Sequence, residues 1–150
     1  MLSFNKLNES FDKIAPWQKI VDKPRKQIYS WKIDGHKYEL VAENIIADIG
    51  LWKIKFTIEN PNKPGEQTTD ATGTGNEMSV FATVMNIIIK DFIPTVNPEK
   101  MYIAATKSEQ GKSSNRSRLY GKLLKRFLSK DWTIKEKDSN RTIDFFLVKK

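Results

Sequence analysis

Residues 27–42 read QIYSWKIDGHKYELVA, and this stretch predicts a β-hairpin. Apolar and polar side chains alternate on both sides of a central Asp34-Gly35 pair, as they do in half-buried strands. An Asp-Gly pair readily adopts the positive φ angles of a two-residue hairpin turn. A third strand is expected at residues 51–58, where the alternation leaves one strongly apolar face. The domain therefore begins with an antiparallel sheet.

Beyond this sheet the pattern alternates between helix and strand. Residues 60–75 are rich in Asn, Pro, Gly and Thr and predict a long surface loop. Apolar residues recur at helical spacing from Val80 to Phe92, and Pro94 is expected to end that helix. A buried strand is then expected at residues 101–106.

The last third of the chain predicts one helix and one hairpin. The helix carries an apolar stripe made of Leu119, Tyr120, Leu123, Leu124, Phe127 and Leu128. The hairpin is expected from two strand patterns at residues 132–137 and 142–148. Together these elements predict an α+β fold with a mixed, mostly antiparallel sheet and two main helices. It forms a single domain over residues 27–150 behind an N-terminal arm at residues 1–26.

The composition narrows the kinds of site that this domain can hold. The 150 residues include no cysteine, which excludes disulfides, thiolate metal sites and a cysteine nucleophile, and favours a cytoplasmic location. The single histidine, His36, follows Gly35 in the predicted turn, so neither a zinc site nor a Ser-His-Asp triad is expected. We expect no metal. We also expect no membrane partner, because the longest apolar run is interrupted by Lys90 and Asp91.

The charge is strongly basic. The chain has 26 Lys and Arg against 18 Asp and Glu, a net charge of +8, which favours polyanionic partners such as DNA, a phosphorylated cofactor or an acidic protein. The densest basic region contains Lys107, Lys112, Arg116, Arg118, Lys122, Lys125 and Arg126. Such a region can contact a phosphate backbone, and the alternative is an ordinary solvated helix face. The aromatic residues mostly fall on apolar faces, which argues against single-strand binding.

Residues 72–76, Thr-Gly-Thr-Gly-Asn, lie between the long loop and the first helix. Glycines there let backbone N–H groups approach an anion, and the following helix N-terminus adds unpaired donors. This motif and the order of elements over residues 27–150 resemble the GNAT superfamily of acyl-CoA-dependent N-acyltransferases. The resemblance implies that Gly73, Thr74, Gly75 and Asn76 bind the pyrophosphate of acetyl-CoA. The family has Gln or Arg three residues before the first glycine, whereas this chain has Asp70, whose charge repels a pyrophosphate. The alternative is that the glycines only shape a loop and Asn76 caps the helix.

A second motif, Ser-Arg-Leu-Tyr-Gly-Lys-Leu at residues 117–123, is similar to the Leu-Tyr-x-Lys-Leu run of the late GNAT helix. The resemblance implies that Tyr120 is catalytic and protonates the CoA thiolate as it leaves. Arg116 and Arg118 are the residues expected to help hold the cofactor. The alternative for Tyr120 is an ordinary core position, as is usual for an aromatic in an apolar stripe. The sequence does not identify a general base.

The first ten residues are similar to the start of small proteins of T-even-like tailed phages, in which a targeting peptide is cut after a Leu-x-Glu step, here Leu7-Asn8-Glu9. An amphipathic arm is the alternative explanation.

These observations leave three possible functions. The first is an N-acyltransferase that moves an acyl group from acyl-CoA to an amine. The second is a non-catalytic basic phage accessory or virion protein that binds DNA or an acidic host or virion protein, in the host cytoplasm or the virion. The third is a purely structural partner in a particle.

Overall fold

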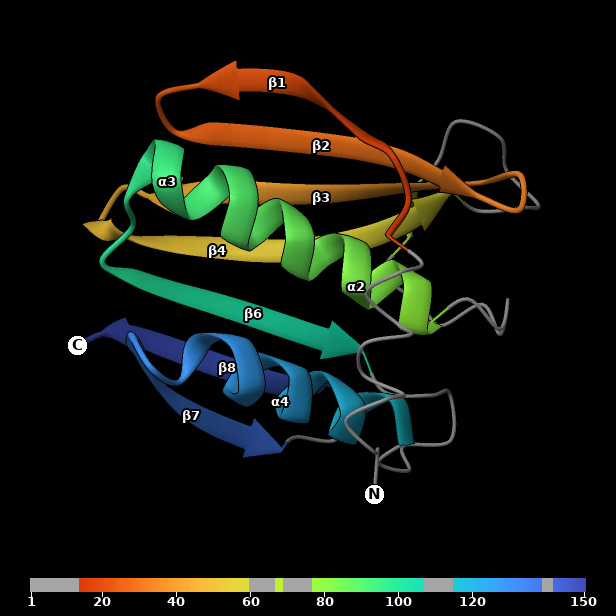
Figure 1. The fold of residues 1–150 in the computed structure, drawn as a ribbon. Helices are drawn as coiled ribbons and strands as arrows, with labels where there is room; N and C mark the ends of the chain where they lie inside the picture. The colour runs from red at the N-terminus through yellow and green to blue at the C-terminus, as the bar shows by residue number, and fades with distance from the viewer. Residues whose placement is uncertain (1–13, 60–66, 69–76, 107–114, 139–141) are drawn as a thin grey trace.

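The computed structural model describes residues 14–59, 67–68, 77–106, 115–138 and 142–150. Its elements, in chain order, are β1 (Trp17–Lys23), β2 (Lys26–Ile33), β3 (His36–Ile45), β4 (Asp48–Glu59), β5 (Gln67–Thr68), α2 (Glu77–Ile87), η1 (Ile88–Phe92), α3 (Ile93–Val96), β6 (Lys100–Thr106), α4 (Asn115–Leu128), β7 (Trp132–Asp138) and β8 (Thr142–Lys149). This is a single α+β domain, as the sequence predicts (Figure 1).

All the described strands belong to one open sheet. The strand order is β1-β2-β3-β4-β6-β8-β7, and the short β5 pairs with the end of β4. Neighbouring strands are antiparallel except β4 and β6, which are parallel. The sheet is therefore mixed and mostly antiparallel, which confirms the prediction.

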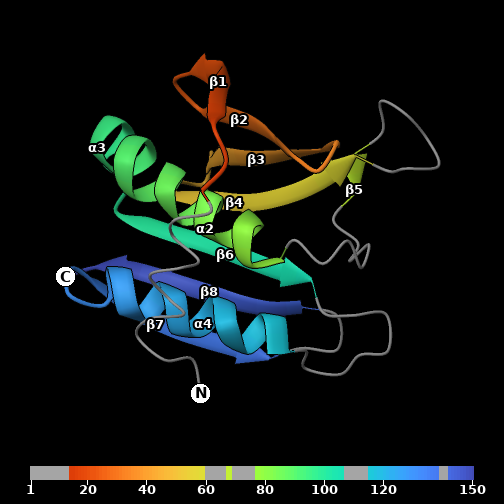
Figure 2. The same cartoon turned by 45° about the vertical axis from the view of Figure 1, so that its right-hand side comes forward.

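The helices of the described chain lie on one side of this sheet (Figures 1 and 2). The continuous helical segment α2-η1-α3 crosses the middle of the sheet, and α4 packs beside it over β8 and β7. The core lies between these layers and includes the fully buried Tyr29, Leu40, Ile54, Phe81 and Phe145. Because successive side chains of a strand point to opposite sides, every second side chain lies under the helices. The remaining side chains lie on the opposite side of the sheet, which we call the open face.

The β2–β3 hairpin has the turn that the sequence predicts. Asp34 and Gly35 have φ angles of 50° and 81°, and Ile33 pairs with His36 across them. A type I′ turn requires positive φ at both central residues, and its twist matches that of the two flanking strands.

The first helix ends differently from the prediction. Helical backbone continues through Pro94 to Val96, because a π-helical turn, η1, precedes the proline. In that turn the Ile93 N–H donates to the Ile88 carbonyl, which changes the hydrogen-bond register just before the residue that lacks an N–H. The helix ends at Asn97, whose φ of 53° and ψ of 57° are left-handed.

The same helix is long and apolar enough to pass a simple test for a membrane span. By length and composition alone, Ser79–Val96 is apolar enough to cross a membrane, with a mean hydropathy of 1.4. A core helix passes the same test, and here Phe81, Val84, Ile88 and Phe92 are buried in the domain core.

The first strand lies within the residues assigned to the N-terminal arm. Trp17–Lys23 form β1 and pair with β2, so the sheet begins before residue 27. The pairing register shifts between Lys19 and Val21, which is a β-bulge. Exposure still alternates along β1, but the partly buried position 19 holds a lysine and the exposed position 20 holds an isoleucine, so the sequence lacks the alternation of apolar and polar residues that identifies a strand.

Candidate functional site

The candidate site lies where the two parallel strands of the sheet separate. Pairing between β4 and β6 runs from Leu51 and Lys100 to Ile54 and Ile103, and among the described residues it stops there. Both strands continue beyond this point, β4 to Glu59 and β6 to Thr106. Because the strands are parallel, their carboxyl ends lie at the same edge of the sheet.

Each of these strands is followed by one of the main helices. The backbone of α2 begins at Glu77, after β4 and β5, and that of α4 begins at Asn115, after β6. Figures 1 and 2 show both helix N-termini at the edge where β4 and β6 end. Helix N-termini carry unpaired N–H donors and a partial positive charge, and ligands of sheets with parallel strands bind at such a point.

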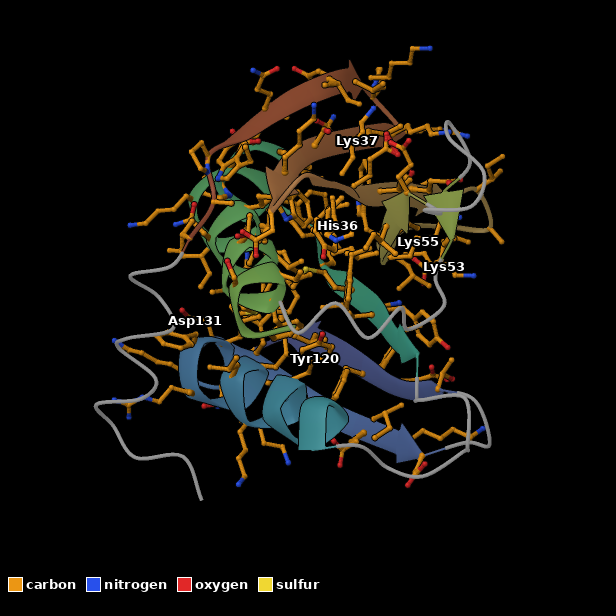
Figure 3. All side chains as sticks on the ribbon, turned by 90° about the vertical axis from the view of Figure 1, so that its right-hand side faces the viewer. His36, Lys37, Lys53, Lys55, Tyr120 and Asp131 are labelled. Atoms are coloured by element: carbon orange, nitrogen blue, oxygen red, sulfur yellow. The ribbon has the colours of Figure 1, made fainter. Side chains whose placement is uncertain are left out.

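Tyr120 lies between the two helices and β4. Its ring stacks on Phe81 of α2, with 3.9 Å between centroids and an interplanar angle of 12°. It also meets Phe56 of β4 edge to face at 5.7 Å, and Phe56 lies beyond the last residue of β4 that pairs with β6. Tyr120 is only 3% exposed, and Figure 3 shows it between α2 and α4. The ring is therefore part of the core and at the same time adjacent to the separating strands.

The two predicted cofactor segments adjoin the starts of α2 and α4 in the sequence. Gly73, Thr74, Gly75 and Asn76 lie outside the described residues, and they directly precede α2. The backbone of residues 116 and 118 lies in the first turn of α4. The starts of α2 and α4 thus share the edge, whereas the side-chain geometry of the cofactor residues remains a prediction.

Only some of the predicted polyanion-binding residues lie in the described part of the chain. Lys107 and Lys112 lie outside the described residues. Lys122, Lys125 and Arg126 are exposed on α4, while Leu123, Leu124 and Leu128 of the same helix are buried, so the helix is amphipathic as predicted. Phe127 departs from the predicted apolar stripe, because it is 38% exposed.

His36 begins β3 directly after the hairpin turn and is partly exposed (Figure 3). Within the described ranges, no group of His, Asp and Glu side chains could hold a metal ion.

A polar cluster that sequence reasoning missed ties the first hairpin to the π-helical turn. The Tyr29 hydroxyl donates to Asp91 Oδ2 at 2.7 Å, and Lys19 Nζ lies 2.8 Å from the same oxygen. Burial raises the pKa of Tyr29, and its hydrogen bond to Asp91 raises it further. Burial also raises the pKa of Asp91, but the hydrogen bonds from Lys19 and Tyr29 outweigh this effect and hold it below its usual value. The ionised Asp91 therefore serves as the acceptor that links β1, β2 and η1.

A pocket of about 590 Å³ lies at the opposite end of β4 and β6. It is bounded by the β1–β2 and β3–β4 turns and the end of α3, with Gln27, Trp52 and Glu99 among its lining residues. None of the site residues expected from the sequence lines this pocket. It is thus separate from the edge where the helices begin.

Compared with models of known protein families and with curated proteins, the sequence matches none of them.

Proposed function

We propose that this protein binds acyl-CoA at the edge where β4 and β6 separate and transfers the acyl group to an amine, as a GNAT-like N-acyltransferase. The observation that carries the proposal is the parallel β4–β6 pair, whose recorded pairing stops at Ile54 and Ile103 at the edge where α2 and α4 begin. Such a point joins backbone groups of two strands to the anion-binding ends of two helices.

The cofactor's charged part would lie at the helix N-termini. Gly73 to Asn76 immediately precede α2, so their backbone N–H groups and those of its first turn would face the pyrophosphate. Arg116 and Arg118, at the start of α4, would supply charge-assisted hydrogen bonds. These arginines must outweigh the repulsion from Asp70. The uncharged arm of CoA carries amide groups, which suit the space alongside strands that no longer pair with each other.

Tyr120 would then act as the general acid. In the reaction, the amine nitrogen forms a bond to the acyl carbon, the C–S bond breaks, and the sulfur receives a proton from the phenol while the amine gives up one to a base. Phe81 and Phe56 hold the Tyr120 ring against β4, and this packing fixes its position on the side of α4 that faces the separating strands. A fixed ring in a partly dry site is the condition for efficient proton transfer.

Calorimetric titration of acetyl-CoA, with desulfo-CoA and heparin as parallel ligands, tests the cofactor proposal. Saturable binding that Gly75→Trp abolishes is expected, because the large side chain fills the predicted pyrophosphate site. Wild-type protein that binds no CoA would remove the proposal. If Gly75→Trp keeps full affinity, the glycine segment is not the cofactor site.

Release of free CoA thiol in the presence of a panel of amines tests the reaction. Tyr120→Phe preserves the aromatic stack and removes only the hydroxyl. We expect it to lower kcat by about 10²-fold or more, the usual worth of general acid catalysis, with acetyl-CoA affinity unchanged. An unchanged kcat would leave Tyr120 with its packing role alone.

The second candidate function is a non-catalytic basic protein of phage type that binds DNA or an acidic protein. The exposed Lys122, Lys125 and Arg126 on the outer side of α4 favour it. Such a protein would ignore CoA and bind heparin with an affinity that falls steeply with salt.

A further inference from the structure

The open face of the sheet carries an aromatic pair flanked by lysines. Tyr102 of β6 is paired with Phe146 of β8. In the same cross-strand row, Lys53 of β4 pairs with Tyr102 on one side, and Lys135 of β7 pairs with Phe146 on the other. The row therefore reads Lys53-Tyr102-Phe146-Lys135 across neighbouring strands.

These side chains point away from the helices. Met101, Ile103, Phe145 and Leu147, the sequence neighbours of the two aromatic residues, are buried in the core. Because adjacent residues of a strand point to opposite sides, Tyr102 and Phe146 face the open side, where both are partly exposed. Within the described part of the chain, no helix covers this side (Figures 1 and 2).

A second pair of lysines extends the charged border on both sides. Lys55 lies two residues after Lys53 on β4, and Lys137 lies two residues after Lys135 on β7, so all of them share the open face. Their side chains are exposed, and Figure 3 shows Lys53 and Lys55 on the side of the sheet away from the helices. Strands lie about 4.8 Å apart, so each lysine pair borders the aromatic pair at a distance that long side chains span.

Acidic residues also lie on this face. Glu43 pairs with Lys53, and Asp144 pairs with Lys137. Glu39 and Glu59 share the face as well, because their neighbours Tyr38, Leu40 and Ile58 are buried in the core. Burial, with a further effect of Asp144, raises the pKa of Tyr102 to about 12, so its hydroxyl adds no negative charge at neutral pH.

We propose that the open face binds a single-stranded nucleic acid, with bases stacked on Tyr102 and Phe146 and phosphates held by Lys53, Lys55, Lys135 and Lys137. A strand laid across the sheet would meet lysine, aromatic, aromatic and lysine in turn. Base stacking on aromatic rings and lysine contacts to the backbone are the two components of this kind of binding. The rings distinguish the occupant from duplex DNA, whose bases are already stacked and inaccessible from the side of the backbone.

Fluorescence anisotropy tests the proposal by measuring the affinity for three labelled ligands. These are oligothymidylate and oligouridylate of about a dozen nucleotides and a duplex of the same length. The single strands are expected to bind more tightly than the duplex. Comparison of the two single strands identifies the sugar, and tight binding of either one supports the proposal. Equal affinity for single strands, duplex and heparin would overturn it, because that result needs only charge.

Matched variants locate the site. Phe146→Leu keeps the side chain apolar and removes the ring, and it should weaken single-strand binding about fivefold or more, with little effect on the duplex. Lys53→Glu/Lys55→Glu should weaken single-strand binding about tenfold or more. The slope of log affinity against log salt concentration should become shallower by about 0.7 for each lost phosphate contact.

The control variant, Lys122→Glu/Lys125→Glu, makes the same change in net charge on α4. It should leave single-strand binding within about twofold of wild type, since the general field of a protein is screened beyond about 10 Å at moderate salt. If the control loses as much affinity as the sheet variant, the basic helix and not the open face binds the nucleic acid. Circular dichroism verifies that each variant is folded. Phe146→Leu that folds and binds as wild type would also refute the proposal.

Discussion

Replacing Asp91 with alanine is expected to destabilise the domain markedly. The change removes the acceptor of the buried Tyr29 hydroxyl, which lies 2.7 Å away, and leaving a buried donor unsatisfied costs about 1–3 kcal/mol. It also removes the ion pair between Asp91 and Lys19. The side chain of Lys19 is 18% exposed and that of Asp91 is 29% exposed, so solvent screens the pair and it contributes about 1 kcal/mol. The free energy of unfolding should therefore fall by about 2–4 kcal/mol, and Tm by roughly 5–15 °C for a domain of this size.

Urea denaturation followed by tryptophan fluorescence measures this change, and Tyr29→Phe is the matched control. That variant removes the donor together with its hydrogen bond and keeps the ion pair, so it should cost only about 1 kcal/mol. If Asp91→Ala costs no more than Tyr29→Phe, the cluster does not anchor the hairpin as we describe.

The same variant has a defined pH dependence. The folded state lowers the pKa of Asp91 below its ordinary value of 3.8, so the ionised carboxylate contributes stability above that value. This contribution is lost as the pH falls through the lower pKa of the folded state. The stability difference between wild type and Asp91→Ala should be constant above about pH 5 and decrease as the pH falls below 3.8. A difference that does not change down to the acid limit would show that charge at Asp91 is not involved.

Three further changes test the packing and the surface. Gly35→Val should lower stability by about 1–2 kcal/mol through backbone strain alone, because φ there is +81° and nothing lies within 4 Å of an added Cβ; urea denaturation measures it. Gly121→Val should cost about 1–3 kcal/mol and reduce the near-UV circular dichroism signal, because an added Cβ would lie 2.9 Å from Glu136 Oε1 and 3.3 Å from the Phe145 ring. A wild-type signal would contradict the close packing of α4. The hydrogen bond from Lys100 lowers the pKa of Asp48, so Lys100→Gln should raise it toward 3.8, and NMR titration that shows no change would exclude the pair.

Local patterns allowed much of the fold to be predicted. The β2–β3 hairpin depends on Asp34 and Gly35 and on the alternation beside them, all of which are neighbours in sequence. The strand β1 was missed because its partly buried Lys19 and its exposed Ile20 reverse the expected order of apolar and polar residues. The continuation of the helix past Pro94 was missed because sequence spacing alone does not reveal a π-helical turn.

The sites were harder to predict because their residues are distant in sequence. Tyr29 and Asp91 are separated by 62 positions, and only the folded packing of β2 against η1 joins them. The sequence pattern predicts that the aromatic residues lie mostly on apolar faces, but Tyr102 and Phe146 lie on the other side of their strands. The assignment of strand faces requires the register of the whole sheet, and that register is a property of tertiary structure.

Among the described strands, β1 and β7 stand at the two ends of the sheet order, and each has a device that discourages pairing with another chain. The bulge between Lys19 and Val21 bends β1, and Lys135 and Lys137 place like charges along β7. A second copy that approached β7 in antiparallel register would bring these lysines together. The lysines of β7 thus protect the folded chain from polymerising edge to edge, a benefit that does not depend on any ligand. Replacing both with threonine is therefore a change that favours aggregation at high protein concentration.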